Sequence, residues 1–162
     1  MLSIAISAKI SLLADIEESV KGTDIIIEDD VVIDSFVKIK PAGGSGTLRI
    51  GLGSHINSGT VIYTGNGVKI GKGCLIAANC TFAPVNHQFV KADTFIKDQG
   101  FLPSKGGIIV EDDVWIGANC VILDGAYLAK GCVVAAHSLV RGKLEAFSIY
   151  AGSPLKMIGV RK

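Results

Sequence analysis

The sequence has few aromatic residues, no excess of either charge and no long apolar segment. Phe, Trp and Tyr make up 6% of its 162 residues, although hydrophobic residues as a whole make up 49%. Sixteen Lys and Arg against fifteen Asp and Glu leave a net charge of +1, which gives no support to a nucleic-acid or membrane-surface partner. No apolar run approaches the ~18 residues of a membrane span, and the N-terminus lacks the apolar core of a signal peptide. We therefore expect a cytoplasmic protein with no membrane span.

The four cysteines follow neither a disulfide pattern nor a zinc pattern. No two of them form a CxxC pair. Each instead falls four residues after a large apolar residue of the repeat described next, where a small apolar side chain suits a core. We expect all four to be buried free thiols: Cys74, Cys80, Cys120 and Cys132.

A six-residue repeat is the strongest pattern that the sequence does contain. From Val110 onward a large aliphatic residue recurs at every sixth position, and a smaller side chain follows four residues later. A period of six fits neither a helix nor a half-buried strand as one continuous element. It is typical of hexapeptide β-helices, in which short strands joined by corners each point one large side chain inward. The predicted inward residues are Ile4, Ile10, Ile16, Ile27, Ile33, Ile39, Ile50, Ile56, Ile62, Ile70, Ile76, Phe82, Val110, Ile116, Ile122, Leu128, Val134 and Val140.

The insertions in this repeat fall only after every third hexapeptide. Three hexapeptides make a coil with three flat sides, so every inserted residue leaves the column at the same edge. We expect an all-β fold, a parallel β-helix of six coils, in a single domain over residues 1–162. Its parts are a less regular N-terminal coil at 1–26 (a short helix over 11–20 is the alternative), an extended loop at 83–107, and a C-terminal tail at 146–162 that begins after the repeat fades beyond Val140.

The extended loop carries the strongest candidate for chemistry, His87. Loops above ~12–15 residues inside a compact domain are usually functional or disordered. This one is too apolar for a solvated tether, and we expect an ordered arm that covers something. A neutral imidazole with a pKa near ~6.5 suits proton abstraction from a hydroxyl. The loop's apolar residues are Phe89, Phe95, Phe101 and Leu102.

The other candidate sites are weaker. His55 and His137 fit outward-facing positions, and with His87 they match no three-histidine pattern, so we expect no metal. The neighbouring carboxylates Asp93 and Asp98 are candidates to orient His87, but nothing selects between them. The loop at residues 41–47 is expected to be flexible and without chemistry. No GxSxG motif, no P-loop and no GxGxxG after a strand occurs.

From about Ile50 to Lys162 the sequence resembles the hexapeptide-repeat acyltransferases, in the branch of maltose and galactoside O-acetyltransferases and polysaccharide-modifying acetyltransferases. The most specific segments are IAAN at 76–79 leading to Asn86-His87, DVWIG at 113–117, and AGSPLKMI at 151–158. The resemblance implies a left-handed winding, an exception to the usual right-handed crossover. It also implies a homotrimer with sites between subunits, and acetyl-CoA as co-substrate.

The resemblance further implies roles for individual residues. His87 corresponds to the general base, and Asn57 and Trp115 correspond to residues that line the acceptor site. The alternatives without a functional role are that Trp115 covers a corner of the column, and that Arg141 and Lys156 are solvated surface charges. Contacts to the acetyl thioester and to CoA correspond to the backbones of Ala118 and Ala136 and to the side chains of Arg141 and Lys156.

The implied reaction is direct transfer of the acetyl group from acetyl-CoA to a hydroxyl of a small carbohydrate acceptor, in surface polysaccharide or lipopolysaccharide biosynthesis. The base removes the hydroxyl proton, and a backbone N–H stabilises the oxyanion. Residues 1–49 depart from the sugar acetyltransferases, because they continue the coils where those enzymes carry a helical segment with an acidic residue. The alternatives are an N-acetyltransferase of an amino (nucleotide-)sugar, and a non-catalytic or metal-binding trimeric β-helix protein.

Overall fold

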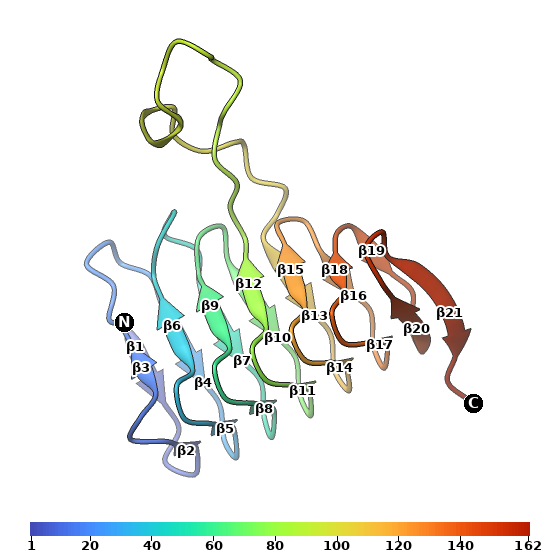
Figure 1. Cartoon of the computed structure of the whole chain (residues 1–162). Helices are drawn as coiled ribbons and strands as arrows, with labels where there is room; N and C mark the ends of the chain where they lie inside the picture. The colour runs from blue at the N-terminus through green and yellow to red at the C-terminus, as the bar shows by residue number, and fades with distance from the viewer.

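The chain winds into a left-handed parallel β-helix of triangular cross-section. The computed structural model describes all of residues 1–162. In Figure 1 the strands of the front sheet run upward while the chain advances from the N-terminus at the left to the C-terminus at the right, and each coil returns behind; this is left-handed winding. None of its helical segments has the length and apolar character needed to cross a membrane. The predicted β-helix is confirmed.

Three sheets form the sides of the column, and each strand from β1 to β17 pairs with the strand one coil further along. Sheet A contains β1 (Leu2–Ile4), β4 (Ile25–Ile27), β7 (Leu48–Ile50), β10 (Val68–Ile70), β13 (Ile108–Val110), β16 (Tyr127–Leu128) and β19 (Lys143–Leu144). Sheet B contains β2 (Lys9–Ile10), β5 (Val32–Ile33), β8 (His55–Ile56), β11 (Leu75–Ile76), β14 (Trp115–Ile116), β17 (Val133–Val134), β20 (Ser148–Ala151) and β21 (Lys156–Val160). Sheet C contains β3 (Asp15–Ile16), β6 (Lys38–Lys40), β9 (Val61–Tyr63), β12 (Thr81–Ala83), β15 (Val121–Leu123) and β18 (Leu139–Val140). We call the three edges corner AB, corner BC and corner CA, after the sheets that they join.

The interior is filled by the inward residues that the six-residue period predicts. Every one of them from Ile27 to Val140 is at most 1% exposed. The first coil differs because no coil lies below it: Ile4 is 41% exposed, and Ile10 and Ile16 are only half-buried. Residues 11–20 form β3 and turns, not a helix.

The four cysteines are buried free thiols, as predicted. The Sγ of Cys80 donates to Gly117 O at 3.2 Å, and that of Cys120 donates to Ala135 O at 3.2 Å, each on the next coil. Burial raises the pKa of Cys74 and raises the pKa of Cys132 to about 12. These thiols are core side chains.

The repeat does not fade after Val140, and that prediction was wrong. A partial seventh coil follows, in which β19 and β20 pair with β16 and β17. Leu144 and Tyr150 fill its inward positions and are at most 9% exposed. Only Arg141 and Gly142 link the two coils at corner CA. The inward residues Val140 and Leu144 are therefore fewer than six positions apart in the sequence, and a fixed count of six no longer identifies the inward residues after Val140. Residues 156–160 then return as β21, antiparallel to β20.

All of the long insertions leave at corner CA, as the spacing predicts. The longest begins after β12 ends at Ala83 and returns before β13 begins at Ile108. We call residues 84–107 the arm. It stands clear of the column in Figure 1 and carries the short 3-10 helix η1 (Ile96–Asp98).

Candidate functional site

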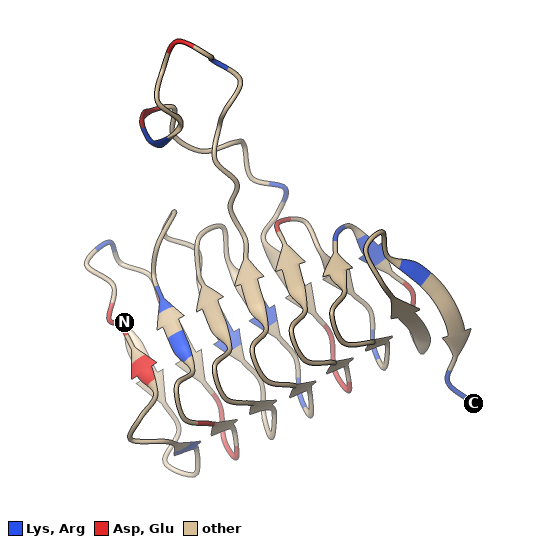
Figure 2. Cartoon of the chain, viewed as in Figure 1, with Lys and Arg blue, Asp and Glu red and all other residues tan.

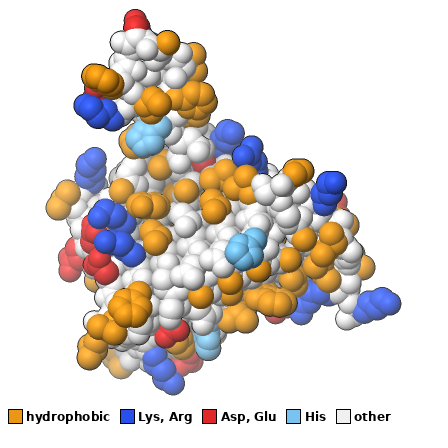
Figure 3. Space-filling model, in the orientation of Figure 1, with side chains coloured by type: hydrophobic (Ala, Val, Ile, Leu, Met, Phe, Trp, Pro, Cys, Tyr) orange, Lys and Arg blue, Asp and Glu red, His pale blue; other side chains and the backbone are white.

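The arm is an ordered finger with two antiparallel limbs. Leu102 N–H donates to Asn86 O at 2.8 Å, and Gln88 N–H donates to Gly100 O at 3.0 Å. Near the tip, the Gln99 side-chain amide donates to the carbonyls of Lys91 and Thr94, both at 2.8 Å. Hydrophobic side chains gather on its surface (Figure 3). The prediction of an ordered rather than a disordered loop is therefore met.

His87 lies exposed near the root of the arm. It faces Phe101 on the returning limb in an antiparallel bridge, and the two ring centroids are 4.7 Å apart with a tilt of 39°. The candidate orienting carboxylates point elsewhere, because Asp93 accepts from the Thr94 hydroxyl and Asp98 pairs with Lys97. The imidazole is thus held by an aromatic ring, and its nitrogens are bonded to no carboxylate of this chain.

The outgoing limb of the arm is seated on two glycine corners of the coils before it. A Cβ placed on Gly43 would lie 2.9 Å from Val85 Cγ2, and one on Gly65 would lie 2.5 Å from Val85 Cγ1. Gly46 N–H also donates to Gly65 O at 2.8 Å, which joins the two corner loops. The loop at 41–47, which was expected to be flexible, therefore supports the root of the arm.

The predicted acceptor and thioester residues lie along one side of the column, on several successive coils, and away from His87. Asn57, Ala118 and Ala136 are at corner BC, and Trp115 is on the outer face of sheet B, between Leu75 and Val133. Trp115 is 50% exposed. His87 is at corner CA, so the width of sheet C separates it from this group. One chain alone does not bring the predicted site residues together.

Two features of corner BC bear on what it can bind. The backbone N–H groups of Ala118 and Ala136 donate to no acceptor in the chain. The same holds for Ser58 and Ala78 on earlier coils, so free donors are a property of this corner and do not single out one site. Asn57 already uses its amide, because Nδ2 donates to Ile76 O at 2.7 Å.

The two predicted cations lie near the C-terminal end of the column. Arg141, at corner CA, lines a surface hollow of about 430 Å³ with Leu139, Ser153, Pro154 and Leu155. Lys156 is exposed at the start of β21. Neither cation forms an ion pair in the structure, so both are available to an anionic ligand.

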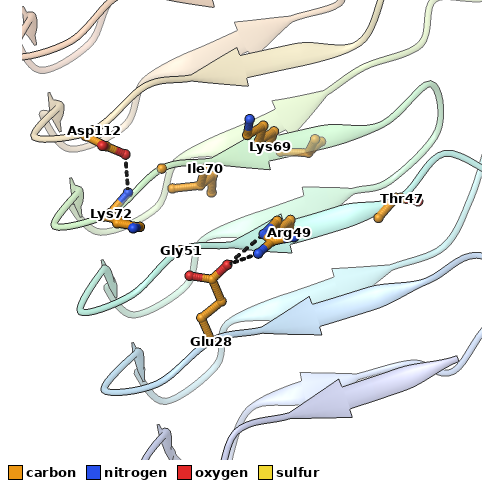
Figure 4. A pocket seen from close by; sticks show the side chains of 10 residues that line it. Glu28, Thr47, Arg49, Gly51, Lys69, Ile70, Lys72 and Asp112 are labelled. Atoms are coloured by element: carbon orange, nitrogen blue, oxygen red, sulfur yellow. Dashed lines mark hydrogen bonds and ion pairs between the residues drawn. The ribbon is translucent and has the colours of Figure 1, made fainter.

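A hollow of about 520 Å³ lies elsewhere, on the outer face of sheet A (Figure 4). Its acidic side chains already have partners: Glu28 accepts from Arg49 Nε at 2.6 Å, and Asp112 accepts from Lys72 N–H at 2.7 Å. Burial alone would raise the pKa of Glu28, but the hydrogen bond from Leu52 N–H and the Arg49 guanidinium outweigh it and lower that pKa. None of the predicted site residues lines this hollow, and Figure 2 shows both charges dispersed along the column.

The three histidines lie apart, on β8, on the arm and at corner BC. No group of three metal-ligating side chains gathers in the structure. One residue with an evident structural role was missed by the sequence analysis: Asp124, which is 6% exposed at corner CA and bonds to the arm. The only sequence signal for it is a carboxylate placed directly after an otherwise apolar strand.

Comparison with known proteins gives two family matches and several relatives. A model described as bacterial transferase hexapeptide (six repeats) matches residues 107–142, and one described as hexapeptide repeat of succinyl-transferase matches residues 49–82. A probable macrolide acetyltransferase of Lysinibacillus sphaericus is 43% identical over 60 residues, which are 37% of this chain and 33% of the relative. A 2,3,4,5-tetrahydropyridine-2,6-dicarboxylate N-acetyltransferase of Staphylococcus aureus is 48% identical over 56 residues, 35% of this chain and 23% of the relative. The chain therefore matches a third or less of the length of these relatives.

Among solved structures, the likeness extends over nearly the whole chain. A variant of AntD, an N-acyltransferase from Bacillus cereus in complex with dTDP and coenzyme A, has a TM-score of 0.82 and 25% identity, covering 99% of this chain and 84% of AntD. A hexapeptide-repeat containing acetyltransferase from Vibrio cholerae, complexed with acetyl-CoA, has a TM-score of 0.63 and 26% identity, covering 87% of this chain and 70% of the other.

Proposed function

We propose that this chain, which matches two hexapeptide-repeat transferase models and resembles hexapeptide-repeat acyltransferases over nearly its whole length, transfers the acetyl group of acetyl-CoA directly to a hydroxyl of a small carbohydrate. The observation that carries the proposal is the exposed imidazole of His87, presented by a hydrogen-bonded arm that leaves the column at corner CA. A catalytic base must be accessible and held in place, and His87 meets both requirements.

The proposed chemistry uses groups that this chain presents. Neutral His87 accepts the proton of the acceptor hydroxyl as the oxygen attacks the thioester carbonyl. A free backbone N–H at corner BC, proposed to be that of Ala118, stabilises the oxyanion of the tetrahedral intermediate. The C–S bond then breaks, and the imidazolium returns its proton to the CoA thiolate. The proposed CoA contacts are the Ala136 backbone and the cations Arg141 and Lys156.

The proposed site needs more than one copy of the chain. His87 lies at one edge of sheet C, whereas Asn57 lies at the opposite edge and Trp115 beyond it on sheet B, so in the proposed site a second copy supplies one of the two halves. We propose a homotrimer with three equivalent sites, each formed by the arm of one chain and corner BC of a neighbour. Native mass spectrometry tests this state, and a monomer with full activity would rule out the shared site.

A second candidate is N-acyl transfer to an amino sugar. It is favoured by the likeness to AntD, an N-acyltransferase whose structure was also determined with dTDP-4-amino-4,6-dideoxyglucose and coenzyme A, over 99% of this chain. An unprotonated amine needs less help from a base than a hydroxyl does. The two candidates therefore differ in how strongly turnover depends on His87.

One experiment tests both candidates. Purified protein is incubated with acetyl-CoA and a panel of sugars, amino sugars and nucleotide sugars, and free thiol is followed over time. Mass spectrometry of the product then separates an ester, which hydroxylamine cleaves, from an amide, which it does not. Acceptor-dependent thiol release with an ester product supports the first candidate. Thiol release at the background rate with every acceptor would instead favour a non-catalytic column.

A further inference from the structure

Asp124, at corner CA between β15 and β16, bonds to both ends of the arm. Its backbone N–H donates to the carbonyl of Ala83, the last residue before the arm leaves, at 3.1 Å. Its carboxylate accepts from the returning limb, Oδ2 from Lys105 N–H at 2.8 Å and Oδ1 from Gly107 N–H at 2.9 Å. One residue of the column thus ties together the two ends of the arm.

The surroundings of this carboxylate strengthen the tie. Oδ2 also accepts from Asn66 Nδ2 at 3.2 Å, on the corner loop one coil before the arm. The residue is only 6% exposed, and hydrogen bonds to a charged acceptor are stronger than neutral ones when water is excluded. Next to it, Gly125 N–H donates to Gly107 O at 2.7 Å. The returning limb therefore cannot shift without breaking several hydrogen bonds at once.

A short path of contacts leads from this tie to His87. The returning limb runs back from Lys105 to Phe101, whose ring is the surface on which the imidazole rests. Leu102 N–H bonds the carbonyl of Asn86, the residue before His87, so the two limbs are joined at that level. The outgoing limb has a separate anchor, because Val85 packs on Gly43 and Gly65. Releasing the returning limb would therefore move Phe101 relative to His87.

We propose that Asp124 is a positioning residue that fixes the direction in which the arm presents His87. The inference rests on the proposed function, since it assigns Asp124 to the same site. Asp124 does not touch the acceptor or acetyl-CoA in this scheme, and acts only through the backbone of the returning limb. Displacement of a catalytic group by about 1 Å lowers the rate by up to about 100-fold, so loss of the tie should reduce kcat between about 10-fold and 100-fold.

The test compares Asp124→Ala and Asp124→Asn with a matched control, Asp112→Ala. Asp112 also accepts a backbone N–H from another coil, that of Lys72, but lies at corner AB, away from the arm. The first readout is limited trypsin digestion followed by mass spectrometry, which reports cleavage after Lys91 and Lys97 in the arm and needs no substrate. The second is kcat, the KM for acetyl-CoA, and the pH dependence of kcat with the acceptor identified above.

We expect faster cleavage within the arm and a lower kcat for both Asp124 variants, with the KM for acetyl-CoA and the pH midpoint of kcat unchanged. Asp112→Ala should match the wild type in both readouts. Wild-type rates of arm cleavage in Asp124→Asn would overturn the inference, and so would a loss of activity accompanied by cleavage throughout the column. If the wild-type protein transfers no acetyl group, the proposed function fails, while the digestion still decides whether Asp124 holds the arm.

Discussion

Replacing Ile76 by alanine should destabilise the column far more than the same replacement at Ile4. Both residues fill the inward position of their coil, but they differ in what surrounds them. Ile76 is fully buried between Ile56 and Ile116 on the coils before and after, whereas Ile4 is 41% exposed and has Ile27 on one side only. Because each coil contacts only its neighbours, the effect of a deletion depends on whether both neighbours are present.

The expected magnitudes follow from this difference in burial. Removing a fully buried isoleucine side chain costs about 2–5 kcal/mol, through lost burial and the cavity left behind. At Ile4 water fills the space left by the side chain, and part of that side chain was already exposed to solvent, so the free energy of unfolding should fall by only about 1 kcal/mol. For a chain of this size these values lower Tm by roughly 6–15 °C and about 3 °C. Urea unfolding followed by circular dichroism measures both variants, and equal losses would refute the stacked-coil account of stability.

Three further predictions concern the thiols and the glycine corners. The stability of the fold should decline as pH rises above about 8.5, because burial raises the pKa of Cys74 and Cys132 and the unfolded chain then releases protons that these two thiols keep in the native state. Cys132, with its pKa raised to about 12, should contribute about 1 kcal/mol of this loss by about pH 9.5. Cys132→Ala should therefore reduce the slope of urea-derived stability against pH. All four thiols, including Cys74 and Cys80, should resist iodoacetamide at pH 8 in the native protein and react fully in urea, and rapid native labelling would contradict their place in the core. Gly107→Ala should lower stability more than Gly73→Ala. Both positions have positive φ, which costs about 1–3 kcal/mol for alanine, but only at Gly107 would the new Cβ also collide with backbone, at Gly67 O. Equal thermal shifts in the two variants would argue against that close approach.

The regular part of the fold could be predicted because one physical requirement repeats in every coil. A narrow prism needs one large side chain and one small one from each side, and those sizes recur in the sequence every six residues. The position of the arm followed from the same count, since insertions are tolerated at only one corner. The six-residue period failed after Val140, where only Arg141 and Gly142 connect one coil to the next. This short connection shifts every later inward residue away from the period, although β19 and β20 still pair in register with β16 and β17.

The candidate site was predictable in its parts and not in its assembly. The position of His87 beside a long insertion marked it from sequence. Its support by Asp124 did not appear there, because the carboxylate meets Asn66, 58 residues earlier, and Lys105, 19 residues earlier, only after the coils have stacked. Equally, no local pattern reveals that His87 and Trp115 lie at opposite sides of sheet C, since that depends on the winding of the chain.

The most direct test of the account is the rate of acceptor-dependent thiol release from acetyl-CoA by the wild-type protein and by His87→Ala. Calorimetric titration of acetyl-CoA into both proteins serves as the control for an intact binding surface. The account predicts a rate lower by about 10²–10⁴-fold in the variant with the affinity for acetyl-CoA preserved. Equal rates in the two proteins would contradict it, because the imidazole presented by the arm would then take no part in the transfer.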